Sequence, residues 1–352
     1  MSSFLEYVPG TSPLHRMNPV AKLAAAAAFA LACFCSSNLA FLAVLLAAGF
    51  ALAATCGMVR PAIGLAKAVF AFSLILAVVQ VLTTPSGAVL VDGDGELYTK
   101  SAARELVFAA NQAGCAFMGA PLVEATGSLQ NFKVRAMLRK TDCLSAYTAC
   151  AAELVARLMS DAPPAHRHPR LMVLHASNRK TSNTIALWER MAPQLEGRVD
   201  TQVVNLRNGT VADCNGCEFR TCLHFGEEGR CFYGGVIVDE VYPAITQADG
   251  VLWLCPNYND ALAANLTACI NRLTALFRTT PFYDKELYGI IVSGYSGGDI
   301  VAQQLISALC MNKAFRLPPR FCLLETANDA GAAVKLPGID RRLADFAAHM
   351  FS

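Results

Sequence analysis

Hydrophobic and polar positions divide this chain into two stretches of different character. Residues 1–90 carry only five charged side chains and contain three apolar runs, at 20–34, 39–54 and 68–82. Each run would form a helix about 24 Å long. This is shorter than the hydrocarbon core of a bilayer, which is about 30 Å thick and usually needs about 20 residues to cross. We expect membrane helices whose ends are extended by flanking lysines, and a buried helical hairpin of a soluble protein is the alternative.

The positively charged residues of this first stretch predict its orientation. Arg16 and Lys22 precede or open the first run, while Arg60 and Lys67 lie between the second and third. Positive residues favour the cytoplasmic side, so three crossings would leave the rest of the chain outside. We therefore expect a fourth crossing at 106–123. This makes residues 1–125 an all-α transmembrane segment at the cell membrane, with the C-terminal domain cytoplasmic.

A helical connector is predicted next. Residues 128–160 place apolar side chains at helical spacing, after the basic residues Lys133, Arg135, Arg139 and Lys140. A basic amphipathic helix could lie on anionic lipid, or it could simply pack on the following domain. The Pro-rich stretch 161–169 marks a boundary. The expected domains are thus residues 1–125, 126–169 and 170–352.

From residue 170 onward, short apolar segments alternate with longer amphipathic ones. Strands are predicted at 170–176, 201–206, 250–255, 287–293 and 320–325, and helices at 185–195, 236–247, 261–277 and 300–311. Strands that are apolar throughout are typical of a parallel sheet covered on both faces. The alternation predicts an α/β domain with a doubly wound parallel five-stranded sheet, which binds ligands beyond the carboxyl ends of its strands.

Three polar loops fall at such strand ends. The first is a hydroxyl-rich strand-to-helix turn that presents N–H groups and a positive helix end to an anion. Its candidate phosphate ligands are Ser177, Arg179, Ser182, Asn183 and Thr184. A helix cap without any ligand is the alternative for this loop.

The other two loops suit a flat ring system. The loop at 256 offers Tyr258 as a surface for a ring, and the glycines at 294–298 let the backbone approach a ligand closely. The candidate ring-binding residues are Pro256, Asn257, Tyr258, Asn259, Ser293, Gly294, Tyr295, Gly297 and Gly298. Together the three loops predict a site for flavin mononucleotide (FMN).

Four cysteines between the second strand and the second helix are candidate metal ligands. Cys214, Cys217, Cys222 and Cys231 could complete a [4Fe–4S] cluster or a zinc site, and unmetallated thiols are the alternative. The chain has 14 cysteines, and in so long a chain free thiols indicate a reducing compartment. The net charge of +2, without a basic stripe, excludes nucleic acid as an expected partner.

The loop and strand-end motifs resemble those of the NAD(P)H-dependent FMN reductase and iron–sulfur flavoprotein group. Its loop reads Gly-Ser-Pro-Arg-x-x-Gly-Asn-Thr, and here residues 176–184 read Ala-Ser-Asn-Arg-Lys-Thr-Ser-Asn-Thr. Ala248-Asp249-Gly250, Pro256 and Tyr258 also match, and the resemblance covers about residues 170–328. It implies a flavodoxin-like fold, bound FMN, NAD(P)H as co-substrate, and a homodimer. The electron acceptor, a small molecule or a protein, is unknown, and the family's cysteine spacing is more compact than the one here.

The opening of the chain resembles a different family. Residues 7–23, from Tyr-Val-Pro-Gly to Pro-Val-Ala-Lys-Leu, resemble the start of the transmembrane T component of energy-coupling-factor transporters, with Asn18 where that family has Asp. The resemblance covers about residues 5–112 and lacks the family's coupling helices, so we interpret it as a membrane anchor. A flavin-dependent oxidoreductase is the expected function. The alternatives are a membrane-anchored electron carrier and a T-component-like membrane protein with a non-catalytic flavodoxin-like domain.

Overall fold

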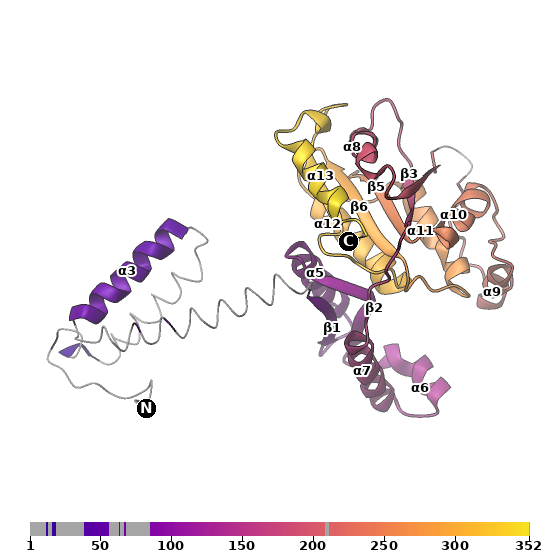
Figure 1. Cartoon of the computed structure of the whole chain (residues 1–352). Coiled ribbons are helices and arrows are strands. Elements are labelled where there is room, and N and C mark those ends of the chain that lie inside the picture. The colour runs from indigo at the N-terminus through magenta and orange to yellow at the C-terminus, as the bar shows by residue number, and fades with distance from the viewer. Residues whose placement is uncertain are drawn as a thin grey trace. The chain divides into compact units, whose positions relative to one another are not determined.

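A computed structural model describes residues 39–55, 85–207 and 211–351, with a few isolated positions before residue 68. The chain forms two compact units, Met1–Thr83 and Thr84–Ser352 (Figure 1). The first unit contributes one described helix, α3 (Leu39–Thr55), which carries no charged side chain. The apolar runs predicted at 20–34 and 68–82 lie outside the described residues. Over the described part of the chain, no helix is both long and apolar enough to cross a membrane.

The predicted fourth crossing at 106–123 is wrong. These residues belong to a β-α-β segment of the second unit: β1 (Ser86–Asp92), α5 (Thr99–Gln112) and β2 (Ala116–Ala125). The two strands are parallel, with Ser86 opposite Ala116. Asn111 of α5 is fully buried, and its side-chain nitrogen donates to the carbonyls of Cys115 and Pro318. The all-α segment expected up to residue 125, and the transporter resemblance expected up to 112, are therefore wrong from residue 86 onward.

The connector forms helices, as predicted, but belongs to the same unit. It comprises η1 (Gln130–Phe132), α6 (Lys133–Arg139) and α7 (Cys143–Met159). Asp142 caps α7 by accepting the Ser145 N–H at 2.9 Å. One face of α7 buries Ala146, Cys150 and Leu154 in a cluster that also contains Met118 and Val123 of β2. No domain boundary thus separates residues 126–169 from the sheet that follows.

The predicted five-stranded parallel sheet is confirmed. It comprises β3 (Arg170–His175), β4 (Asp200–Asn205), β5 (Gly250–Pro256), β6 (Glu286–Ser293) and β7 (Cys322–Thr326). The order across the sheet is β4-β3-β5-β6-β7, with every pair parallel. The chain therefore runs outward in both directions from β3, which is the flavodoxin-like order.

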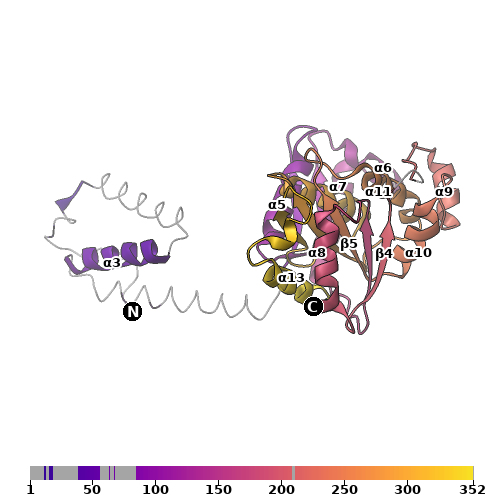
Figure 2. The same cartoon turned by 90° about the horizontal axis from the view of Figure 1, so that it is seen from above.

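Helices cover both faces of this sheet (Figure 2). One face packs on α8 (Asn183–Met191) and α13 (Ile339–His349), through Leu187 and Phe346 among others. The other face packs on α10 (Tyr242–Gln247), α11 (Ala264–Phe277) and α12 (Gly298–Leu305). The remaining elements are α9 (Phe219–Glu227), the π-helical turns η3 (Ile237–Val241) and η4 (Ile306–Met311), and the short helices η2 (Ala192–Leu195) and η5 (Ala333–Lys335).

The β-α-β segment and the sheet share contacts on the side of β6 and β7. Phe117 of β2 exchanges backbone hydrogen bonds with Leu317, at 2.9 and 2.8 Å. Asp161, which follows α7, accepts two hydrogen bonds from the Arg316 guanidinium at 2.7 and 2.8 Å. Both guanidinium and carboxylate are nearly buried. Residues before the predicted boundary thus complete the core of the second unit.

Candidate functional site

The first predicted loop joins β3 to α8 at the carboxyl edge of the sheet. Ser182 caps α8, because its Oγ accepts the Ile185 N–H at 3.4 Å and lies 2.9 Å from Thr184 Oγ1. The loop also closes on itself. Asn178, which stands where the resembling family has proline, accepts the N–H groups of Lys180, Thr181 and Ser182 at 3.0–3.2 Å. The turn is therefore formed before any ligand binds.

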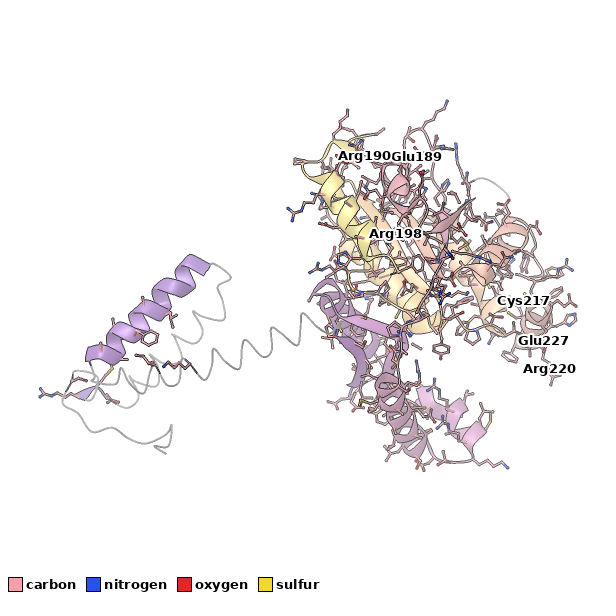
Figure 3. All side chains as sticks on the ribbon, in the orientation of Figure 1. Glu189, Arg190, Arg198, Cys217, Arg220 and Glu227 are labelled. Carbon is pink, nitrogen blue, oxygen red and sulfur yellow. The ribbon has the colours of Figure 1, made fainter. Side chains whose placement is uncertain are left out.

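Two of the predicted phosphate ligands are engaged elsewhere. The Asn183 amide donates to the carbonyls of Ala327 and Asp329, and its oxygen accepts the Ala333 N–H. This side chain therefore ties α8 to the loop after β7. Arg179 is exposed and pairs with Glu189 of α8 at 2.8 Å. Glu189 lies beside Arg190 on the same helix in Figure 3.

The second and third predicted loops are joined by the side chain of Asn257. Its Nδ2 lies 3.1 Å from Ser293 Oγ, 3.1 Å from the Ser296 carbonyl and 3.2 Å from Asp260 Oδ1. Pro256 ends β5 opposite Val292, whose carbonyl accepts the Asn257 N–H at 2.9 Å. The ends of β5 and β6 thus form one polar rim at the carboxyl edge.

A tight turn at 258–261 gives this rim its shape. Tyr258 and Ala261 exchange backbone hydrogen bonds at 3.2 Å around Asn259 and Asp260. Both central residues have positive φ, 54° and 58°, as a two-residue hairpin turn of type I′ requires. The side chain of Gln304, on α12, stabilises the turn: it donates to the Asp260 carbonyl and accepts the Leu262 N–H.

The glycines of the third loop are needed for close packing against this turn. Gly297 has φ +87°, and a Cβ built there would lie 1.9 Å from Asp260 Oδ1. A Cβ on Gly294 would lie 2.9 Å from Asn328 Oδ1, and one on Gly298 would lie 3.2 Å from Ser293 Oγ. Asp260 and Asn328 were not among the predicted site residues, because their place on the rim follows from contacts between loops that are distant in the sequence.

Two predicted residues present aromatic side chains to solvent. Tyr258 is 58% exposed and Tyr295 is 81% exposed, one on each loop of the rim. An exposed tyrosine leaves apolar surface in water that a planar ligand can cover. By contrast, two polar atoms of the three loops are buried and have no hydrogen-bond partner among the residues that the structure describes: Ser177 Oγ and Asn257 Oδ1. Because an unsatisfied buried polar atom is costly, these atoms are suited to a ligand's polar groups.

His175, the last residue of β3, is a further buried polar residue that sequence reasoning missed. The one feature of the sequence that could have indicated a role for His175 is its position directly before the hydroxyl-rich loop. Burial lowers the pKa of His175 from its usual value, so the folded protein favours the neutral imidazole.

This lowered pKa predicts a pH dependence of stability. Between the folded pKa and about 6.5, the unfolded chain binds more protons, so the free energy of unfolding should rise with pH in that window and level off above it. Urea unfolding of residues 84–352 from pH 5 to 8 measures this dependence. A His175→Gln variant should lose that part of the slope. An unchanged slope in the variant would assign the effect to other groups.

The four predicted metal-ligating cysteines lie on the long loop between β4 and η3 and on α9. Cys214 is exposed, the others are half-buried, and all four are free thiols. They line one cavity of about 140 Å³ together with the aromatic residues Phe225, Phe232 and Tyr233. Cys217 lies near Arg220 and Glu227 at one edge of the unit (Figure 3).

The donor geometry of these thiols does not fit a cluster. Within residues 85–207 and 211–351, no three His, Cys, Asp or Glu side chains are arranged to hold a metal ion. The cavity wall also includes the guanidinium of Arg272, which is buried and donates to the carbonyls of Ala212 and Gly234. The structure therefore gives no support to the expected [4Fe–4S] or zinc site.

Comparison with protein families bears on the three loops. Residues 169–329 match the family model of NADPH-dependent FMN reductases. This segment contains β3 to β7, the three loops and the cysteines. The match confirms the expectation of an oxidoreductase and the family resemblance over this part of the chain. A search of curated proteins finds no match.

Three solved structures of redox proteins are among those that align with the backbone of this chain. An azoreductase from Bacillus anthracis str. Sterne has 14% identity, covers 52% of this chain and 98% of its own, and gives a TM-score of 0.39. The NAD(P)H:quinone oxidoreductase from Methanothermobacter marburgensis has 14% identity, 52% and 98% coverage and a TM-score of 0.36. An FMN-dependent NADH-azoreductase from B. anthracis str. Ames Ancestor has 9% identity, 52% and 100% coverage and a TM-score of 0.35. These scores are too low to extend the family match.

Proposed function

We propose that the chain is a flavin-dependent oxidoreductase that passes electrons from NAD(P)H through FMN to a small-molecule or protein acceptor. One observation carries this proposal: Ser177 Oγ and Asn257 Oδ1, on two loops at the carboxyl edge, are buried without a partner in the described part of the chain. Both lie in the segment that matches the FMN reductase family. A bound phosphate and a bound ring with polar edges would satisfy these two atoms.

The phosphate end of the cofactor fits the N-terminus of α8. The first turn of a helix has N–H groups without intrahelical partners, and its dipole favours an anion. Ser177 Oγ, on the same loop, supplies a hydroxyl donor. Arg179 forms an exposed ion pair with Glu189, and such pairs contribute at most about 1 kcal/mol. Its guanidinium can therefore turn toward a phosphate at little cost.

The ring end fits the rim formed by the other two loops. FMN, when bound, supplies the two-electron chemistry between a nicotinamide and an acceptor. Asn257 would present its unpartnered oxygen to a ring N–H, while Gly294, Gly297 and Gly298 let backbone N–H groups approach closely. Tyr258 and Tyr295 would cover the ring and exclude water from it. The chain's part is to bind and orient, and no side chain is assigned as acid or base.

Absorption spectroscopy tests the proposal. The full chain, purified anaerobically in detergent, should show flavin bands that bleach when NADPH is added. Acid-released cofactor should be FMN, and reoxidation by a quinone or an azo dye would identify the class of acceptor. A colourless protein that also fails to bind added FMN would contradict the proposal. Flavin that binds but is not bleached by NADPH or NADH would indicate an electron carrier.

Removing the Ser177 hydroxyl separates ligand binding from stability. We expect Ser177→Ala to weaken FMN binding about tenfold, the value of one hydrogen bond to a charged group. Without ligand, the variant should be as stable as the wild type or more stable, because it loses an unsatisfied buried hydroxyl. Ser182→Ala is the matched control: loss of its cap should cost about 1 kcal/mol of stability. Fluorescence titration and thermal unfolding measure both effects.

We also propose that the chain works at the cell membrane, with residues 84–352 on the cytoplasmic side. Support for the membrane comes from residues 1–90, which hold only five charged side chains. Support for the cytoplasmic side comes from the free cysteines of residues 84–352, which suit a reducing compartment. Cell fractionation with alkaline extraction tests membrane attachment. Protease digestion of sealed vesicles of known orientation tests the side. Recovery of the chain in the soluble fraction would overturn this proposal.

A further inference from the structure

Helices α6 and α7 carry large apolar side chains on their solvent-exposed faces, in addition to those that they bury in the core. The inner face of α7 is buried against β2, as described above. On the two helices, six large apolar side chains are between 58% and 82% exposed: Val134, Met137, Leu138, Leu144, Val155 and Met159. In Figure 1 both helices lie at the end of the second unit opposite to α8. Both helices are therefore remote from the loop between β3 and α8.

Positive charge accompanies this apolar surface. Residues 133–140 include four basic side chains and no acidic one. Two of them are engaged within the unit: Arg139 pairs with Glu153 at 2.8 Å, and Arg135 donates to the sulfur of Cys150 at 3.0 Å. Lys133 and Lys140 are exposed and form no ion pair with any residue in the part of the chain that the structure describes. Their charges are available to a partner.

This combination discriminates between the partners that could cover the surface. A second copy in a two-fold dimer would place the same patch against itself, so the lysines of one copy would face those of the other. Apolar side chains beside free lysines are instead typical of helices that lie in the interface of an anionic bilayer. There, long apolar side chains enter the boundary of headgroups and acyl chains, and lysines meet lipid phosphates.

We propose that the α6–α7 surface of the second unit binds anionic lipid headgroups. Met137, Leu138 and Val134 would insert at the bilayer surface, and Lys133 and Lys140 would supply the preference for anionic lipid. The surface would bring the oxidoreductase unit itself onto the membrane, independently of residues 1–83. The inference does not depend on the flavin site, since no residue of that site lies on α6 or α7.

Vesicle flotation tests the surface. Residues 84–352 form a compact unit with their own sheet and cores, so they can be studied alone. We expect this unit to float with vesicles of phosphatidylcholine and phosphatidylglycerol but not with phosphatidylcholine alone, and to be released at about 1 M salt. Lys133→Glu/Lys140→Glu should lower partitioning about 30-fold or more. Met137→Glu/Leu138→Glu should lower it at least tenfold.

A matched charge reversal controls for net charge. Lys335→Glu/Arg341→Glu changes two exposed basic residues, one at the end of η5 and one on α13, and should leave flotation unchanged. Thermal unfolding and FMN titration verify that every variant remains folded, because all the altered side chains are exposed. Equal flotation with neutral and anionic vesicles would overturn the proposal. So would the absence of flotation together with a dimer in solution that Met137→Glu/Leu138→Glu dissociates, which would assign the surface to a second copy.

Discussion

Gly297→Ala is expected to weaken FMN binding about 100-fold and to lower the free energy of unfolding by about 2–3 kcal/mol. The new Cβ would lie 1.9 Å from Asp260 Oδ1 and 2.9 Å from Asn257 Nδ2. One of these groups must therefore move. Because Asn257 Nδ2 also binds Ser293 and the Ser296 carbonyl, its displacement would disrupt both loops that are proposed to hold the ring.

Two controls separate this contact from the cost of the backbone conformation. Gly197 has φ +75° with no atom within 4 Å of its built Cβ, compared with φ +87° at Gly297. Gly197→Ala should therefore cost only the ~1 kcal/mol of a left-handed alanine and leave FMN binding intact. Adding Asp260→Ala to Gly297→Ala should restore part of the affinity. If Gly197→Ala and Gly297→Ala lowered stability equally and neither affected FMN, the close approach would have no role in the site.

The sheet could be predicted from the sequence because its central strands, β3, β5 and β6, are buried on both faces. β5 is buried along Gly250–Cys255, and all eight residues of β6 are buried. Each contains a continuous apolar segment that is followed directly by polar residues. The predicted starts and ends agree with the observed ones to within two residues. The polar loops follow from the same rule, since parallel strands bring their carboxyl ends to one edge.

The roles of individual side chains could not be predicted in this way. Asn183 matches a family position, yet its amide binds residues about 145 positions later in the chain, in the loop after β7. Arg179 pairs with Glu189 on the helix that follows its loop. Asp260 belongs to the rim because Gly297 approaches it closely and Asn257 donates to its carboxylate. Each of these facts depends on a tertiary contact and leaves no local pattern.

The wrong membrane crossing had a different cause. It was inferred from the number of crossings needed to return the chain to the cytoplasm, although Asn111 and Gln112 lay within the proposed span. These polar residues belong to the end of α5, where Asn111 binds the backbone before β7, including the N–H of Phe321. A polar residue that is satisfied by a distant backbone has the same sequence pattern as one that interrupts a membrane helix.

Asp161→Ala is expected to lower the free energy of unfolding of residues 84–352 by about 3 kcal/mol or more. The Asp161 carboxylate is about 10% exposed and the Arg316 guanidinium about 12%, and they form two hydrogen bonds. Removing the carboxylate leaves a nearly buried positive charge without its partner. Asp161 precedes β3, whereas Arg316 lies between η4 and β7, so the pair ties the β-α-β segment and its helices to the far end of the sheet.

The surface pair of Arg190 and Asp340 provides the matched control. It also has two hydrogen bonds, but its side chains are 49% and 66% exposed, so Asp340→Ala should cost less than about 1 kcal/mol. Urea unfolding followed by circular dichroism compares the two variants. Asp161→Leu/Arg316→Met should recover stability, because it removes both charges and fills the space with apolar groups. Equal losses in Asp161→Ala and Asp340→Ala would mean that the segment before β3 contributes little to the stability of the sheet. The larger loss expected for Asp161→Ala would instead mean that the oxidoreductase unit begins near residue 84 and that a fragment beginning at residue 170 lacks part of its core.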